Sequence, residues 1–418
     1  MTQQSTGPSN LSCLFVHQNF PGQFKFLAPT LAANPSNRIM AVAMRGPRAR
    51  PEGPIKYCEY SLNRGSTPGV HPWVGDLETK VVRAEAALAA AVKLRATGFN
   101  PDVIIAHPGW GDSLFLKEVW PKARLGMYCE FFYHARGADV GFDPEFEQSG
   151  IEMACRLRLK NLNQEMHIAQ AHAGLSPTQW QRSTYPEPFR SSISVIHDGI
   201  DTTRLQPNAQ ATLQLPDGSS LTRADEVITF VNRNLEPYRG YHIFMRSLPE
   251  ILRRHPKARV VIVGADKTGY GAKAPDGKTW KEIFLKEVSA GLDLNRVHFV
   301  GNLDYPRFVS LLQLSTVHVY LTYPFVLSWS LMEAMSCGCA IVASNTAPLK
   351  EMIMHGQTGL LTDFFDFRAL ADKVCELLAD PEQRNRLGAA AREFVASRHD
   401  LRRHCLPRQL EWVRKLAN

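Results

Sequence analysis

Short apolar runs alternate with helical segments twice along this chain, and a polar stretch separates the two series. In the first series the runs expected to form strands are 11–17, 103–106, 125–129, 173–175 and 193–196. In the second series they are 227–231, 259–263, 297–300, 317–321 and 340–343. Strands that alternate with helices form parallel sheets covered by helices on both faces. The sequence therefore predicts an α/β chain with two Rossmann-like parallel-sheet domains.

The polar, turn-rich stretch 202–224 marks the expected junction between these domains. A length of 418 residues also favours two cores over one. We expect an N-terminal domain at 1–205, a C-terminal domain at 206–395, and a final helical segment at 396–418 that packs back on the N-terminal domain. Ligands of such folds lie outside the carboxyl ends of the strands, so both domains are expected to face a common cleft.

Local sequence signals also predict individual helices in the second half. The segments 241–254 and 305–314 are expected to be helical. Asp380-Pro381 is typical of a helix start, with Asp380 as the capping residue and Gln383 completing a capping box.

Composition excludes several classes of protein. No run of 18 apolar residues occurs, so no membrane-spanning helix is predicted. The eight cysteines lack zinc-site spacing, which favours free thiols in a reducing cytoplasm and no metal.

The net charge of +8 indicates either a solvated basic face or attraction to an anionic membrane surface or a phosphate-bearing substrate. No nucleic-acid-binding signature occurs, so no nucleic acid partner is expected. The basic residues gather at Arg45, Arg48 and Arg50 and again at Arg156, Arg158 and Lys160.

The segment 317–338 is typical of a strand, a tight turn and a helix that ends at Gly338. The free N–H groups of a helix start suit a phosphate group, and Ser328 and Ser330 add hydroxyl groups. Glu333 lies about one turn further along, where a carboxylate can accept hydrogen bonds from a ribose. The alternative is an ordinary strand-turn-helix unit with a surface glutamate.

Two arginines follow the first strand of the second series. Arg233 and Arg239 lie on either side of a turn, and guanidinium groups grip phosphate oxygens in a fork. Both are expected to converge on one diphosphate, with Glu236 holding one of them in place. The alternative is a charged surface turn.

Residues at other expected strand ends are further candidates for the cleft. Gly22 and Gly264 follow strands, and glycine lets the backbone approach a ligand closely. His107, Glu130 and His134 can act as a base or bind a sugar hydroxyl. For each histidine the alternative is a structural role, and for Gly22 it is a simple turn.

Taken together, these segments resemble the retaining glycosyltransferases of family 4, which have the GT-B fold. Residues 196–201 resemble that family's PNGVD segment, and Arg233 and Arg239 fall on its R…K-G motif, with Arg239 in place of the usual lysine. Residues 331–338 match LEAMACG, and residues 356–361 match DGxTGLL.

Two positions depart from the family pattern. The family commonly has two glutamates eight residues apart; Glu333 is the second, whereas Phe325 occupies the position of the first. Many members also end an N-terminal strand with a histidine, where this chain carries Glu130 followed by His134. In the family, both positions lie close to the transferred sugar, so the resemblance implies that this chain contacts the sugar with other side chains.

The resemblance implies transfer of a sugar from a nucleotide diphosphate sugar to a glycan or lipid-linked acceptor, with retained anomeric configuration. It implies an acceptor-side N-terminal domain, a donor-side C-terminal domain, and no metal or cofactor. The alternatives are a nucleotide-sugar binding protein without catalysis, or an epimerase or phosphorylase on the same scaffold. The expected location is the cytoplasm, with peripheral attachment to the inner membrane face as a further candidate. The implied catalytic residues are Glu130, His134, His107, Arg233 and Arg239, and the implied donor-binding residues are Gly22, Gly264, Ser328, Trp329, Ser330, Leu331 and Glu333.

Overall fold

The computed structural model describes residues 10–46, 53–146 and 149–418, so Arg48 and Arg50 of the first basic group lie outside the described residues. These residues form two compact units. Unit 1 comprises the described residues of Met1–Ala135, Gln148–Gly199 and Leu401–Asn418. Unit 2 comprises those of Arg136–Glu147 and Ile200–Asp400, so a short segment of the N-terminal half belongs to the second unit.

Unit 1 is built on a parallel sheet with the strand order β3-β2-β1-β4-β5-β6-β7. The order reverses between β1 and β4, which is where doubly wound folds bind ligands. Its strands are β1 (Ser12–Val16), β2 (Arg38–Met44), β3 (Lys56–Tyr60), β4 (Val103–Ala106), β5 (Arg124–Tyr128), β6 (Ala173–Ser176) and β7 (Ile193–Val195).

Helices cover both faces of this sheet. One hydrophobic cluster joins the sheet to α1 and α13, and another joins it to α2 and α3. A Cβ atom at Gly126 of β5 would lie 2.5 Å from Leu416 of α13, so the last helix lies directly against this strand. The helices are α1 (Leu27–Ala32), α2 (Gly75–Ala96), α3 (Leu116–Val119), α4 (Ile151–Ile168), α5 (Gln179–Ser183) and α13 (Leu406–Ala417).

Unit 2 repeats this plan, with the parallel strand order β12-β11-β10-β13-β14-β15. Here the order reverses between β10 and β13. The strands are β10 (Val227–Asn234), β11 (Arg259–Ala265), β12 (Val297–Gly301), β13 (Val317–Tyr320), β14 (Ala340–Ser344) and β15 (Leu360–Thr362).

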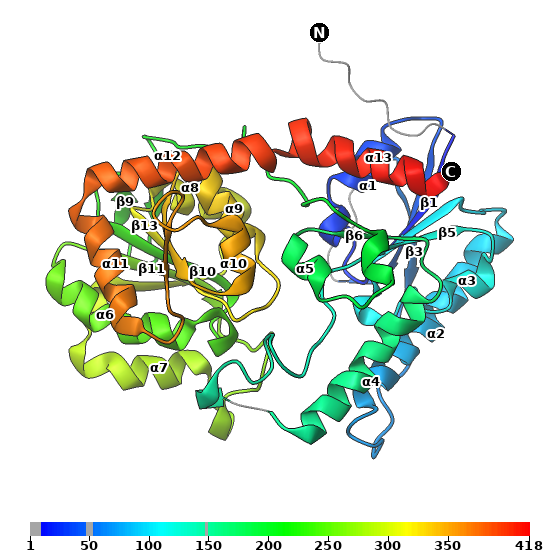
Figure 1. Cartoon of the computed structure of the whole chain (residues 1–418), viewed down its shortest axis with the longest axis horizontal. Helices are drawn as coiled ribbons and strands as arrows, with labels where there is room; N and C mark the ends of the chain where they lie inside the picture. The colour runs from blue at the N-terminus through cyan, green and yellow to red at the C-terminus, as the bar shows by residue number, and fades with distance from the viewer. Residues whose placement is uncertain (1–9, 47–52, 147–148) are drawn as a thin grey trace, which may run out of the picture. The chain divides into compact units, whose positions relative to one another are not determined.

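Two helical layers enclose the sheet of unit 2 (Figure 1). The layer of α6, α7 and α11 shares one hydrophobic cluster with the sheet, and the layer of α8, α9, α10 and α12 shares another. The helices are α6 (Tyr241–Arg254), α7 (Trp280–Val288), α8 (Tyr305–Leu314), α9 (Trp329–Ser336), α10 (Ala347–Met352), α11 (Phe367–Ala379) and α12 (Pro381–Arg398).

The stretch 202–224 differs from the loop that its polar composition predicts. It contains an antiparallel hairpin of β8 (Thr212–Gln214) and β9 (Ser220–Thr222). Leu213 and Leu221 of this hairpin are buried in the core of unit 2, because alternate residues of a half-buried strand point inward. Across the described residues, no helix is both long and apolar enough to cross a membrane.

Candidate active site

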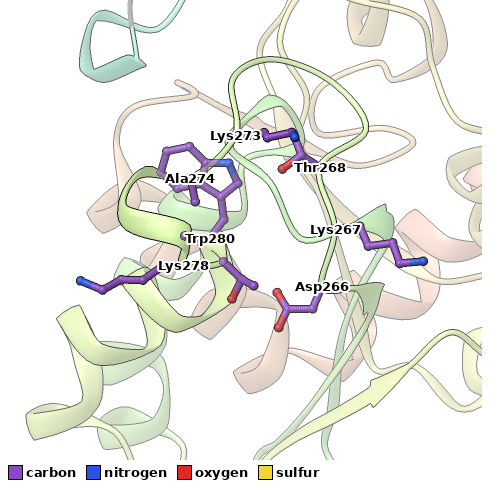
Figure 2. A pocket seen from close by; sticks show the side chains of 9 residues that line it. Asp266, Lys267, Thr268, Lys273, Ala274, Lys278 and Trp280 are labelled. Carbon is purple, nitrogen blue, oxygen red and sulfur yellow. The ribbon is translucent and has the colours of Figure 1, made fainter. Parts of the chain in front are cut away.

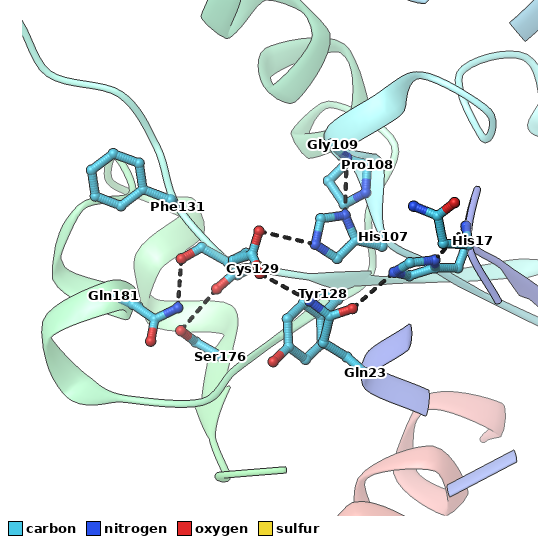
Figure 3. A network of polar contacts seen from close by, with 12 residues as sticks. His17, Gln23, His107, Pro108, Gly109, Tyr128, Cys129, Phe131, Ser176 and Gln181 are labelled. Atoms are coloured by element: carbon cyan, nitrogen blue, oxygen red, sulfur yellow. Dashed lines mark hydrogen bonds and ion pairs between the residues drawn. The ribbon is translucent and has the colours of Figure 1, made fainter. Parts of the chain in front are cut away.

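Three polar side chains of unit 1 follow the carboxyl ends of neighbouring strands. His17 follows β1, His107 follows β4, and Glu130 lies two residues beyond β5. Since β1, β4 and β5 are adjacent in the sheet, these side chains are brought together at the point where the strand order reverses. Figure 3 shows His17 and His107 in this cluster. His107 and Glu130 were predicted from the sequence as site residues, whereas His17 was read only as the end of a strand.

A hydrogen-bond path links His17 to Glu130 through Gln23. The backbone N–H of Asn19 donates to His17 Nδ1 over 2.9 Å, which leaves the proton on Nε2. That nitrogen then donates to Gln23 Oε1 over 2.8 Å. The Gln23 amide nitrogen in turn donates to Glu130 Oε1 over 2.9 Å. The carboxylate is thereby oriented from one side.

His107 approaches the second oxygen of the same carboxylate. Its Nδ1 accepts a hydrogen bond from the Gly109 backbone N–H over 3.1 Å, so Nε2 carries the proton. Nε2 lies 3.4 Å from Glu130 Oε2, a longer contact than the one from Gln23. The His107 ring is stacked on Tyr128 with a centroid distance of 5.5 Å, which fixes its plane.

These contacts set the charges of the cluster. Burial lowers the pKa of His17 to about 3, with a further contribution from His107, so His17 is neutral at physiological pH. Burial by itself raises the pKa of Glu130, but His107, His17 and Gln23 together hold it below its ordinary value. The Glu130 side chain is 37% exposed. It is therefore an ionised, accessible carboxylate that can accept a proton or stabilise positive charge.

Gly22 is required by this cluster. Its φ is +48°, and a Cβ atom there would lie 2.2 Å from His17 Nε2. The sequence predicted that Gly22 leaves room for a ligand. In the structure the His17 ring fills the space that a side chain would need, so Gly22 lets His17 and Gln23 pair, and its contact with a ligand stays a prediction.

The segment after Glu130 is held firmly by α4 and α5. The Glu130 carbonyl accepts a hydrogen bond from Gln181 over 2.7 Å, and Tyr133 exchanges backbone hydrogen bonds with the Asn161 amide. His134 Nε2 donates to the Thr184 carbonyl over 2.7 Å. His134 therefore fixes the loop, which is the structural alternative considered for it.

A second carboxylate of unit 1 lies at the end of β7. Asp198 is buried and accepts a hydrogen bond from the Tyr128 hydroxyl over 2.9 Å. Burial and Asp198 raise the pKa of Tyr128 well above its ordinary value, so the phenol keeps its proton. The sequence offered a signal here, because Asp198 lies in the segment that resembles PNGVD.

In unit 2 the turn after β10 places the two arginines differently. Arg239 is buried, and its Nη1 donates to Thr322 Oγ1 and to the Val326 carbonyl, each over 2.8 Å. Arg233 lies on β10 with an exposed side chain. Arg239 thus holds the turn after β13, while Arg233 faces solvent. Their convergence on one diphosphate stays a prediction.

The Glu236 carboxylate lies near Arg239, whose positive charge acts to lower its pKa, but it accepts hydrogen bonds from the loop after β11. Its Oε2 accepts hydrogen bonds from the backbone N–H groups of Gly269 and Tyr270, over 2.9 and 2.8 Å. The residue is 1% exposed, and burial raises its pKa despite these bonds. Glu236 therefore anchors the long loop that follows β11.

The start of α9 has the form predicted for it. Ser328 is the N-cap, and its hydroxyl oxygen accepts hydrogen bonds from the backbone N–H and the hydroxyl of Ser330, over 3.3 and 3.0 Å. Trp329 is half-buried. Leu331 is packed in the core of unit 2, so only its backbone remains for a ligand.

Glu333 is 6% exposed, yet it is not enclosed by apolar side chains alone. The hydroxyl of Tyr305 donates to its Oε1 over 2.9 Å. Tyr305 itself is 38% exposed, so this pair reaches the surface of unit 2. Tyr305 could not be predicted as a partner of Glu333 from sequence, because it belongs to a different helix.

Phe325 occupies an aromatic environment. Its ring centroid lies 5.0 Å from that of Tyr270 and 5.6 Å from that of Tyr238, and the Arg239 guanidinium carbon lies 5.8 Å from it.

Gly264 is close to Leu235, since a Cβ atom there would lie 2.7 Å from the Leu235 side chain. The absence of a side chain at Gly264 therefore allows close packing in the structure.

A cavity of about 340 Å³ lies in the loop after β11 (Figure 2). Its lining is mostly basic and polar, and the predicted donor-binding residues are not among the side chains that form it. The lining residues are Asp266, Lys267, Thr268, Lys273, Ala274, Gly277, Lys278, Thr279 and Trp280.

Two family descriptions match most of the chain. Residues 35–205 match the Glycosyl transferase family 4 group, and residues 217–394 match the Glycosyl transferases group 1. These ranges cover most of the sheet of unit 1 and all of the sheet of unit 2, including the elements that carry His107, Glu130, Arg239 and Glu333.

Curated relatives match about half of the chain. A D-inositol 3-phosphate glycosyltransferase of Rhodococcus jostii is 30% identical over 210 residues, which are 50% of this chain and 43% of the relative. A GDP-mannose-dependent alpha-(1-6)-phosphatidylinositol monomannoside mannosyltransferase of Mycolicibacterium smegmatis is 26% identical over 52% of this chain and 56% of the relative. The matched part thus spans about half the length of these relatives.

Solved structures share the fold over nearly the whole chain. HepE from Anabaena in complex with UDP-glucose gives a TM-score of 0.63 at 15% identity, covering 97% of this chain and 99% of HepE. Sucrose-phosphate synthase from Thermosynechococcus elongatus gives 0.70 at 16% identity, covering 97% and 98%. The fold prediction is confirmed, and the chain belongs to the family 4 glycosyltransferases with the GT-B fold.

Proposed function

We propose that this chain is a retaining glycosyltransferase that transfers a sugar from a nucleotide diphosphate sugar to a glycan or lipid-linked acceptor. The observation that carries the proposal is the set of Arg239, the α9 start and Glu333 in unit 2. These groups follow β10 and β13, the strands between which the sheet order reverses. Support also comes from the relatives, which are named as glycosyltransferases, and from HepE, which was solved with UDP-glucose.

Unit 2 supplies the groups for the nucleotide diphosphate. The N–H groups at the start of α9 and the exposed guanidinium of Arg233 suit the phosphates. Positive charge and N–H donors stabilise the diphosphate as the glycosidic bond breaks. The Glu333 carboxylate, held by Tyr305, accepts hydrogen bonds from the ribose. Because the protein itself supplies this stabilisation, we expect activity without a metal or cofactor.

Unit 1 supplies Glu130 for the transferred sugar. Sugar transfer develops positive charge at the anomeric carbon, and an ionised carboxylate stabilises such charge. Gln23 and His107 fix both oxygens of Glu130, so the carboxylate is oriented before substrate binds. The departing diphosphate takes the proton of the acceptor hydroxyl on the same face of the sugar, which retains the configuration and removes the need for a strong protein base.

A screen of nucleotide sugars tests this proposal. The purified chain is heated with UDP-glucose, GDP-mannose or other donors, and the true donor raises the melting temperature. That donor is then incubated with candidate acceptors, and the released nucleoside diphosphate is measured. Proton NMR of the product gives the configuration of the new bond. An inverted bond contradicts the retaining mechanism, and the absence of released nucleoside diphosphate contradicts the transferase.

Phe325 favours one alternative, a nucleotide-sugar binding protein without catalysis. Its buried ring occupies the position of a carboxylate in the family pattern, which removes one polar group from the sugar side. This alternative predicts thermal stabilisation by a donor without turnover during prolonged incubation. An epimerase instead turns over without an acceptor, and a phosphorylase requires inorganic phosphate.

We also propose peripheral attachment to an anionic cytoplasmic membrane surface. Arg156 and Arg158 are exposed on α4, whereas Lys160 lies over the Tyr133 ring at 3.7 Å and Arg45 lies 3.5 Å from Glu59. The exposed arginines attract anionic lipid at low ionic strength. Sedimentation with vesicles that contain phosphatidylglycerol tests this, and Arg156→Gln with Arg158→Gln is expected to reduce binding. Equal binding to neutral vesicles contradicts it.

A further inference from the structure

The segment 136–146 belongs to unit 2, although it lies in the N-terminal half of the sequence. It lies in the sequence between β5 and α4, which both belong to unit 1. We call this segment the arm. An excursion of this kind requires specific contacts, because ordering an irregular segment costs conformational entropy.

Two carboxylates of the arm bind tyrosine hydroxyls of unit 2. Tyr238 donates to Asp139 Oδ2 over 2.7 Å, and Tyr323 donates to Asp143 Oδ2 over 2.7 Å. Asp139 and Asp143 are 4% and 3% exposed. Hydrogen bonds from neutral donors to buried carboxylates are stronger than those between neutral groups, so these contacts fix the arm and the tyrosines together.

A third carboxylate binds at a different place. Arg246 of α6 donates to both oxygens of Glu145, over 2.6 and 2.7 Å, and also to Glu287. This pair is on the surface, since the side chains of Arg246 and Glu145 are 20% and 41% exposed. Glu145 therefore anchors the arm through a contact of its own.

Aromatic side chains complete the docking of the arm. The Phe142 ring lies 5.1 Å from Tyr323 and 5.3 Å from Phe364 between centroids. The Phe146 ring lies 5.1 Å from Trp280 and 5.2 Å from His242. Such contacts bury large apolar areas and fix the arm at its middle and at its C-terminal end.

The two tyrosines held by the arm flank the Arg239 contacts. Tyr238 immediately precedes Arg239, and Tyr323 immediately follows Thr322, whose hydroxyl accepts a hydrogen bond from Arg239 over 2.8 Å. The tyrosine rings lie 4.6 Å apart, and the Tyr323 N–H donates to the Tyr238 carbonyl over 3.0 Å. The arm thus holds the two backbone turns that position the Arg239 guanidinium.

We propose that the arm is part of the nucleotide-binding site, with Asp139 and Asp143 as positioning residues that act through Tyr238 and Tyr323 on the Arg239 turn. The inference rests on the proposed function, because it assigns a nucleoside diphosphate as the ligand of that turn. In this role the arm acts on the ligand through the turn and not by direct contact. Its carboxylates fix the turn in the conformation that the phosphates require.

A metal-binding site is the alternative explanation for the polar cluster that the arm forms with α6. Asp143, Glu145 and His242 each offer a ligand atom, and these atoms lie within 4.8 Å of one another. Both Glu145 oxygens, however, face the Arg246 guanidinium, and Asp143 Oδ2 already accepts from Tyr323. A guanidinium at this distance repels a cation, so ion pairing explains the cluster better.

Binding of UDP and GDP to the whole chain, measured by calorimetry, tests the inference. We expect Asp139→Asn and Asp143→Asn to raise the Kd of the nucleotide that binds by about tenfold, which equals about 1.4 kcal/mol. Glu145→Gln is the matched control. It loosens the same arm at the Arg246 contact, and the Kd is expected to stay within about twofold of the wild type.

Tyr238→Phe and Tyr323→Phe provide a second test if the aspartate variants do not fold, because each removes only a hydroxyl. Each is expected to weaken binding like the aspartate it contacts, and combining Asp143→Asn with Tyr323→Phe should add little. Unchanged Kd values in the folded aspartate variants overturn the inference. An equal loss in Glu145→Gln also overturns it, because general docking would then explain the effect. If the wild type binds no nucleoside diphosphate, the proposed function fails first.

Discussion

The Tyr305 hydroxyl on α8 donates a hydrogen bond to Glu333 Oε1 on α9, over 2.9 Å. It fixes one oxygen of a carboxylate that is 6% exposed. Arg204 lies over the same tyrosine ring at 4.5 Å, which holds the ring independently of its hydroxyl. The orientation of Glu333 is thus set by a residue from the neighbouring helix.

Substitutions at this pair should change the use of the nucleotide sugar. Glu333→Ala is expected to lower kcat/KM by at least about tenfold, because the ribose loses its acceptor. Tyr305→Phe keeps the ring over Arg204 and removes only the hydroxyl, so we expect a smaller loss of about threefold. Steady-state kinetics with the donor as the varied substrate measures both. Full activity in Glu333→Ala contradicts the site assignment.

Arg233 and Arg239 should give different phenotypes because only one is buried. Arg233→Ala is expected to weaken donor use by at least about tenfold with little change in melting temperature, as its exposed side chain contributes charge to the ligand. Arg239→Ala should also lower the melting temperature, since the Thr322 hydroxyl and the Val326 carbonyl lose their shared donor. Kinetics and thermal melts of the two variants separate these effects. Equal stability losses contradict the assignment.

Gly240 should tolerate alanine poorly because it combines a left-handed backbone with a crowded neighbour. Its φ is +68°, and a Cβ atom would lie 2.3 Å from Leu321 Cβ. Gly301 is the matched control, with a φ of +62° and open space around it. We expect Gly301→Ala to cost about 1 kcal/mol of unfolding free energy through backbone strain, and Gly240→Ala to cost about 3 kcal/mol. Urea unfolding of both variants tests the difference.

Buried histidines should make the protein less stable in mild acid. Burial lowers the pKa of His17 and His318 to about 3 and that of His167 to about 4. Unfolding returns each pKa to about 6.5, so the unfolded state binds more protons and stability falls as the pH drops below 6.5. The loss at pH 5 is on the order of 2 kcal/mol per histidine.

Urea unfolding at pH 7.5 and pH 5 measures this dependence. His167→Gln is expected to reduce it, so that the difference in stability from the wild type narrows at pH 5. His71 is exposed, and His71→Gln should leave the pH dependence unchanged. If the unfolding free energy of His167→Gln changes between pH 7.5 and pH 5 as much as that of the wild type, His167 is not kept neutral.

Much of the fold could be predicted because buried parallel strands and amphipathic helices leave strong local patterns. The bounds of β4, α6 and α8 equal those predicted from the sequence. Asp380 caps α12 as predicted, accepting from the Gln383 N–H over 2.9 Å. The predicted capping box was wrong, because the Gln383 side chain donates to Glu376 and does not bond to the backbone N–H of Asp380. Competing side-chain partners of this kind are invisible in a local pattern.

Other elements escaped prediction for physical reasons. β3 is a half-exposed edge strand with the sequence KYCEY, which lacks a continuous apolar run. β2 carries an apolar run at 39–43, which the strands expected from the sequence do not include. The hairpin of β8 and β9 has few buried residues within a polar stretch, so its turn composition outweighed its strand signal.

Some residues of the candidate site could likewise be predicted from the sequence, and others could not. His107 and Glu130 could be predicted as candidates because they follow apolar runs typical of strands, and Glu333 because the helix that carries it resembles a family motif. The path from His17 through Gln23 to Glu130 depends on β1, β4 and β5 being neighbours, which the sequence does not state. Tyr305 and the arm depend on tertiary contacts alone.

The discontinuous units limit how this protein can be divided. A fragment that ends at residue 199 lacks α13, which exposes the apolar surface that Trp412 and Leu416 cover beside Gly126. A fragment of 200–400 lacks the acceptors for the phenols of Tyr238 and Tyr323. Each such fragment therefore leaves out part of the unit that it is meant to contain, so an exchange of halves between homologous proteins keeps both units whole only when α13 and residues 136–146 move with the unit that each completes.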